Sequence, residues 1–106
     1  MNRISEILNV INGLYLYDDD VARQYISLIN EALDVIRELE TQPTSLLDNA
    51  KIEAITGLSN ELTNRMNENY FHSSPERRKS EFKISKMLVL VALGNVISNM
   101  QPVESV

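Results

Sequence analysis

The sequence predicts an all-α protein, folded as an antiparallel four-helix bundle. Apolar residues recur at the i, i+3, i+4, i+7 spacing of a helix through most of the chain. The sequence has only 3 Gly and 3 Pro, too few for a strand-rich fold with many turns. We expect one domain of 106 residues with a frayed tail at 101–106 and four helices linked by short loops, at about 3–16, 20–40, 46–68 and 75–100.

The first helix has a competing interpretation. Its apolar positions follow the helical rule without a gap: Ile4, Ile7, Leu8, Ile11, Leu14 and Tyr15. Asn12-Gly13, however, is a strong signal for a β-hairpin turn. The residues that follow, "LYLY", do not alternate apolar with polar as a half-buried strand should. We therefore favour a helix, which Gly13 could end early.

Three acidic residues, Asp18 to Asp20, mark the start of the second helix. Carboxylates accept hydrogen bonds from the free N–H groups of a helix start and suit the positive end of its dipole. Pro43 stops this helix, because proline lacks the N–H and disfavours helix in the preceding residue. The helix carries an apolar stripe formed by Val21, Tyr25, Leu28, Ile29, Ala32, Ile36 and Leu39.

The third and fourth helices have different signals. The third has the stripe Leu47, Ala54, Ile55, Leu58, Leu62 and Met66, weakened by Gly57. The fourth has the clearest start in the chain. Ser73 or Ser74 caps it, Pro75 occupies the first turn, and Glu76 completes a Ser73-x-x-Glu capping box.

The run from Met87 to Leu93 is apolar at seven consecutive positions. It is too short for a membrane span, which needs roughly 20 apolar residues. As a strand it would have no partner for its backbone groups. We therefore expect a helix that is covered on all sides, either by the bundle or by a second chain. The predicted core or oligomer seam comprises Met87, Leu88, Val89, Val91 and Leu93.

Composition argues against several functions. The net charge of −5 makes nucleic-acid binding unexpected, although residues 69–86 are locally basic. The chain has no Cys, and "MNRISEILNV" is not a signal peptide, so we expect a cytoplasmic protein. His72 is the one histidine and nothing in the sequence orients it as a catalytic base, so no enzymatic activity is expected. Three adjacent Asp residues lack the spacing of a calcium loop, and no metal or cofactor is expected.

One end of the predicted bundle gathers charges and aromatic rings. An antiparallel arrangement places Asp18–Asp20 near Arg77–Lys79. All six aromatic residues lie within about two turns of that end: Tyr15, Tyr17, Tyr25, Tyr70, Phe71 and Phe82. The rings could close the core, or some could remain exposed for binding, since Tyr and Arg are enriched in interface hot spots. The candidate partner-binding residues are Tyr17, Asp19, Tyr70, Phe71, Arg77 and Arg78.

These patterns predict a non-enzymatic protein-interaction module that binds a protein partner through the end formed by segments 15–25 and 70–82. The alternative is a structural homo-oligomer, such as a homodimer, that associates through the apolar fourth helix. Membrane-surface binding by Lys79, Lys83 and Lys86 ranks lower, because the acidic remainder repels anionic lipid. In size and helix pattern the chain is similar to small bundles in bacteriocin-immunity, phage-inhibitor and secretion-chaperone settings. No single residue carries this likeness, and the interaction role it implies is of inhibitor, immunity, chaperone or adaptor type.

Overall fold

Helices form most of the part of the chain that the computed structural model describes, which is residues 3–15, 18–39 and 45–100. The helices are α1 (Arg3–Asn12), α2 (Asp19–Glu38), α3 (Ser45–Asn64), α4 (Glu68–Phe71) and α5 (Pro75–Met100). The all-α prediction is confirmed, and no strand occurs within those ranges. The expected four helices become five, because the segment at 46–68 ends at Asn64 and a short α4 follows. Tyr17, Pro43, the tail 101–106 and the side chain of Leu47 lie outside the described residues.

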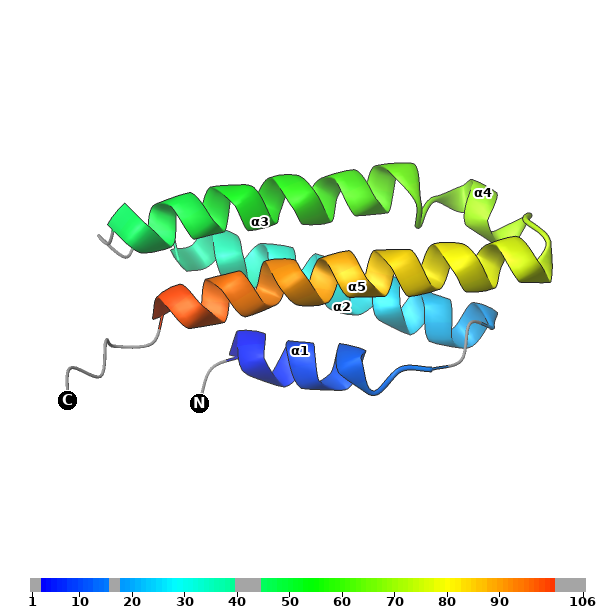
Figure 1. Cartoon of the computed structure of the whole chain (residues 1–106), viewed down its shortest axis with the longest axis horizontal. Helices are drawn as coiled ribbons and strands as arrows, with labels where there is room; N and C mark the ends of the chain where they lie inside the picture. The colour runs from blue at the N-terminus through cyan, green and yellow to red at the C-terminus, as the bar shows by residue number, and fades with distance from the viewer. Residues whose placement is uncertain (1–2, 16–17, 40–44, 101–106) are drawn as a thin grey trace.

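The four long helices pack around a common core (Figure 1). α1 contacts α2 and α5, and α3 contacts the same two helices from the other side, while α4 touches α5 near its start. Each helix contributes fully buried apolar side chains, such as Ile7, Ile29, Leu58 and Val89. Burying such a side chain contributes roughly 1.5–3 kcal/mol. The apolar stripes identified in the sequence therefore do meet in one core.

α1 ends at Asn12 rather than near residue 16. The Gly13 N–H donates to the carbonyls of Asn9 and Val10, and Leu14 N–H donates to Ile11 at 3.0 Å, so the chain closes in a tight turn. Beyond this turn the Leu14 carbonyl accepts a hydrogen bond of 2.7 Å from the Lys86 Nζ of α5. Lys86 of α5 therefore donates to a carbonyl group just beyond α1, where the helix no longer provides a partner.

Polar side chains start α2 and α5. The Asp18 carboxylate accepts from the Val21 N–H at 3.0 Å, which confirms the predicted acidic helix start. At α5 the Ser74 hydroxyl accepts from the Arg77 N–H at 3.3 Å. Ser73 instead donates to the Asn69 carbonyl at 2.8 Å, so the expected Ser73-x-x-Glu box does not form. Ser74 is thus the residue that begins α5.

Asparagine separates α3 from α4. Asn67 Nδ2 donates to the Thr63 carbonyl at 2.7 Å, and Asn67 Oδ1 accepts from the Asn69 N–H at 2.9 Å. One side chain therefore satisfies the end of α3 and the start of α4 at the same time. This local hydrogen bonding explains why the apolar stripe up to Met66 does not continue as one helix to residue 68.

Gly57→Ala is expected to raise the free energy of unfolding by about 1 kcal/mol, because Gly57 lies inside α3 and alanine favours the helix. A Cβ added there meets nothing within 4 Å, so no clash offsets the gain. Urea denaturation of the two proteins would measure it. A loss of stability in the alanine variant would contradict the placement of this residue.

Candidate interaction surfaces

The aromatic end of the protein is largely core. Tyr25 and Phe82 are buried, with ring centroids 5.0 Å apart, and Tyr70 meets Phe71 edge to face at 5.3 Å. The hydroxyl groups of Tyr25 and Ser85 share a buried hydrogen bond of 2.7 Å. Three of the six aromatic side chains, Tyr25, Tyr70 and Phe82, therefore close this end of the core, which is one of the two interpretations that the sequence allowed.

Tyr70, one of the predicted partner-binding residues, is buried in the core. Its side chain is only 2% exposed and lies in the main core cluster. Tyr70→Ala would therefore remove packed core volume, and we expect it to destabilise the fold. Phe71 is half-buried beneath the Arg23 guanidinium, which lies 4.4 Å from the ring centroid. Tyr15 is exposed, and Lys86 Nζ lies 4.6 Å from its ring centroid.

The charges at this end pair across helices. Arg78 of α5 forms an ion pair with Asp19 of α2. The acidic start of α2 and the basic start of α5 therefore lie close together, as the sequence predicts. Arg65 pairs with Glu61 at 3.2 Å and with Glu81 at 3.3 Å, which ties α3 to α5. Such partly exposed pairs contribute roughly 0–1 kcal/mol each. Arg77, by contrast, is exposed and forms no ion pair with a described residue.

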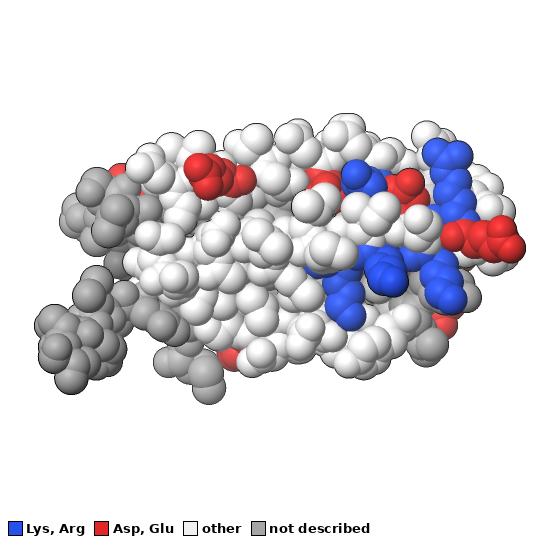
Figure 2. All heavy atoms as spheres, in the orientation of Figure 1, with Lys and Arg blue, Asp and Glu red and all other residues white. Residues whose placement is uncertain are grey.

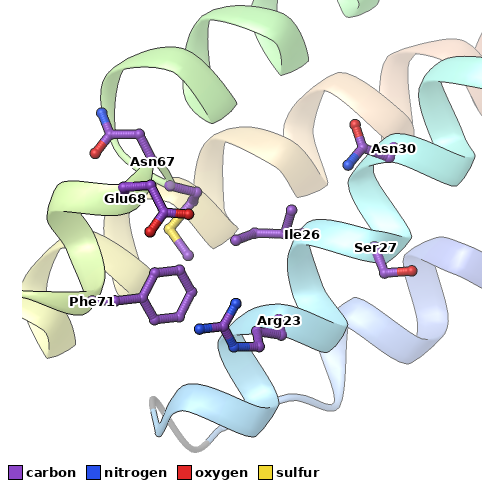
Figure 3. A pocket seen from close by; sticks show the side chains of 8 residues that line it. Arg23, Ile26, Ser27, Asn30, Asn67, Glu68 and Phe71 are labelled. Carbon is purple, nitrogen blue, oxygen red and sulfur yellow. The ribbon is translucent and has the colours of Figure 1, made fainter.

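An open pocket of about 450 Å³ lies beside this end, between α2 and the α3–α4 junction. Ile26, Met66 and Phe71 give it an apolar lining, and polar groups surround them. Figure 3 shows Arg23 on α2 beside the ring of Phe71 on α4, with Asn30 farther along α2. The volume is within the range of ligand sites, but no histidine or paired carboxylates converge there.

A second surface follows α5. Ile84, Met87, Leu88 and Val91 lie at i, i+3, i+4 and i+7, and all four are exposed, at 39%, 58%, 45% and 58% respectively. We call these four residues the α5 stripe. A shallow groove of about 150 Å³ runs along its edge, lined by Leu88, Val91 and Ala92 together with Ala50, Glu53, Ala54 and Asn95.

The predicted seam residues of α5 therefore divide into two sets. Val89 and Leu93 are fully buried in the core. Met87, Leu88 and Val91 lie on the opposite, exposed face, so the bundle does not surround this helix on all sides. Figure 2 shows that face: Lys and Arg gather over the first turns of α5, and the surface over its second half is nearly free of charge.

The sequence pattern could not separate these two sets, because both are apolar. Their burial depends on how much of α5 is covered by α1 and α3. The sequence of α5 alone does not determine that coverage. The pocket between α2 and α4 was also missed, because it depends on the break between α3 and α4. The three asparagines at 64, 67 and 69 were the available signal.

No group of three or more potential metal-binding side chains occurs among the residues that the structure describes. In the same ranges, no helix combines the length and the apolar character that crossing a membrane requires. Comparisons with protein-family models, curated proteins and solved structures find no match to this chain. The fold and its surfaces thus define a small all-α protein with one exposed apolar helix face.

Burial raises the pKa of both Tyr25 and Tyr70. A raised pKa means that the folded state holds the phenol proton more tightly than the unfolded state, whose tyrosines titrate near pH 10. The resulting stabilisation is complete below about pH 10 and is lost as the pH rises through the folded-state pKa. We expect the free energy of unfolding to fall steeply above that pH, and to fall less in Tyr25→Phe. Urea titrations between pH 8 and 11.5 would test it, and equal pH dependence in both proteins would contradict it.

Proposed function

We propose that this chain is a non-enzymatic protein-interaction module that binds through the α5 stripe. In this proposal its framework is an antiparallel four-helix bundle into which the short α4 has been inserted. The observation that carries the proposal is the exposure of Met87, Leu88 and Val91 on a helix whose opposite face already fills the core. Contiguous exposed apolar side chains bordered by polar residues are typical of protein interaction sites.

The spacing of the stripe supports this proposal. Positions i, i+3, i+4 and i+7 are the anchors with which one helix packs against another helix or a groove. The fold does not need these side chains for its own core, because Val89, Leu93 and Val96 already fill it. Charged or polar residues at the same positions would maintain the helix equally well. Their apolar character is therefore best explained by a partner surface.

The end with the α2–α4 pocket is a second candidate binding surface. It retains the exposed Arg77, the half-buried Phe71 and the Arg23 guanidinium over that ring. Arg and aromatic residues are the common anchors of protein interfaces. A protein partner could insert an apolar side chain between Ile26 and Phe71. Asp19 and Arg78 already pair with each other, so their charges are less available to a partner.

Two sets of variants separate these surfaces. Met87→Gln with Val91→Gln should leave the thermal melt within a few degrees of wild type and abolish the native interaction. Phe71→Ala with Arg23→Glu alters the other surface and should leave that interaction intact. Sedimentation of the purified protein measures self-association. Binding to another protein is measured by comparing the host proteins that immobilised wild-type and variant chains retain. If the second pair alone abolishes binding, the pocket end is the binding surface and the proposal fails.

Membrane-surface binding receives less support than either of these surfaces. Of the three lysines that flank the apolar run, Lys86 is engaged by the Leu14 carbonyl and the Tyr15 ring. The net charge of −5 also opposes approach to anionic lipid. We propose a cytoplasmic location, because a chain without cysteine suits a reducing compartment.

A further inference from the structure

We infer that the partner of the α5 stripe is a second copy of this chain, packed with its α5 antiparallel to the first about a two-fold axis. This inference rests on the proposed function, because it assigns an occupant to the same surface. A two-fold interface uses the same patch on both copies, so the patch must complement itself. The distribution of charge along α5 meets that requirement in only one direction.

The two halves of α5 differ in charge. Residues 75–86 contain five basic and two acidic side chains, whereas residues 87–100 contain none. Parallel pairing would place the basic half of one helix on the basic half of the other, and like charges directly opposed across an interface are costly. Antiparallel pairing instead places each basic half over an uncharged half. It also brings cations near the C-terminal end of the partner helix, where the dipole favours them.

An acidic residue lies where the antiparallel arrangement needs one. Glu53 of α3 borders the groove beside Val91 and Asn95, next to the uncharged half of α5. Arg77 lies in the first turn of α5 and lines a small surface pocket with Asn64 and Arg65, so it also faces the α3 side. Neither Glu53 nor Arg77 forms an ion pair with a described residue.

The two-fold axis brings these two charges together. With the axis perpendicular to α5 and lying in the interface, α3 stays on the same side of the seam in both copies while its direction reverses. Arg77 and Glu53 are on that side and on opposite sides of the stripe's midpoint. Arg77 of each copy therefore approaches Glu53 of the other, which gives two equivalent ion pairs at the edge of an apolar seam.

Gly94 supports a close approach of the two helices. It follows the stripe by one turn, it is only half-buried, and a Cβ added there would meet nothing within 4 Å. The fold of a single chain therefore leaves open space beside Gly94. A facing helix could use that space, because a residue without a side chain lets two backbones approach closely.

A charge-swap experiment tests the inference in the full-length protein. Sedimentation equilibrium is run on wild type, Arg77→Glu, Glu53→Arg and an equimolar mixture of the two variants. Each variant alone places like charges opposite each other twice, so its dimerisation should weaken by at least about tenfold. The mixture restores both pairs as a heterodimer and should recover wild-type association. Arg37→Glu is the matched control, because it makes the same change of charge at an exposed site on α2.

Each outcome either supports or overturns the inference. Recovery in the mixture, with unchanged association of Arg37→Glu, supports the antiparallel dimer. A wild-type dimer that both variants leave unchanged, or that mixing does not recover, overturns the antiparallel pairing. A wild-type monomer at high micromolar concentration overturns the second copy as the partner. In that case the experiment with immobilised chains still tests the proposed function. If Met87→Gln with Val91→Gln removes a protein that the immobilised wild-type chain retains, the α5 stripe binds a different protein. The proposed function and this inference can therefore fail separately.

Discussion

Val89→Asp is expected to unfold the protein, whereas Val91→Asp, two residues away on the same helix, is expected to leave it folded. Val89 is 0% exposed, so the new carboxylate would be buried without a partner. The loss should exceed about 4 kcal/mol, a large share of the roughly 5–15 kcal/mol that stabilises a typical domain. Val91 is 58% exposed, so the same substitution there leaves the charge in water.

Circular dichroism during a thermal or urea titration would measure both variants. The experiment is run at low micromolar concentration, so that any association through the exposed face does not add to the apparent stability. Helix propensity is nearly the same for the two substitutions, so the difference between them reports burial alone. A Val89→Asp protein that melts within a few degrees of wild type would show that this face of α5 is not core.

Tyr25→Ala is expected to cost about 3–5 kcal/mol of unfolding free energy, the usual cost of truncating a large buried ring. Tyr25 is fully buried and packs against Phe82. Its hydroxyl also satisfies Ser85, whose side chain is buried inside α5. Removing the ring therefore leaves a cavity and an unpaired polar group together, each with its own cost.

Two smaller changes separate these contributions. Tyr25→Phe keeps the ring but leaves the Ser85 hydroxyl unpaired, and should cost about 1–3 kcal/mol. Adding Ser85→Ala removes the other partner as well, and the double variant should recover part of that loss. Urea denaturation of the single and double variants provides the cycle. Strictly additive losses would show that the two hydroxyl groups do not interact.

The stripes that form the core could be predicted because each carries its own period. The positions of Ile4, Ile7 and Ile11 on one face of α1, and of Tyr25, Ile29 and Ile36 on one face of α2, are local properties of the sequence. The capping role of Asp18 is local in the same way, since it depends on the three residues that follow it. These predictions agree with the structure, whereas the equally local Ser73-x-x-Glu capping box does not form.

Predictions that depended on long-range packing were less successful. Whether a ring such as Tyr70 is buried depends on how neighbouring helices meet above it, and the sequence gives no measure of that. The same applies to α5. Because its middle is apolar on all faces, the sequence does not show which side α1 and α3 cover. Short polar signals were also underestimated: Gly13 ends α1 early, and Asn67 divides the third segment into α3 and α4.

The methyl groups of methionine provide the most direct test of the central claim that the α5 stripe is a binding surface for a second copy. Met87 is 58% exposed in the stripe, whereas Met66 is 3% exposed in the core and serves as an internal reference. With ¹³C-methyl labelling, a soluble paramagnetic agent broadens exposed methyl signals and spares buried ones. At low micromolar concentration Met87 should be strongly broadened and Met66 spared. As the concentration rises Met87 should become protected to the level of Met66, and a Met87 signal that stays equally broadened at every concentration would contradict the claim.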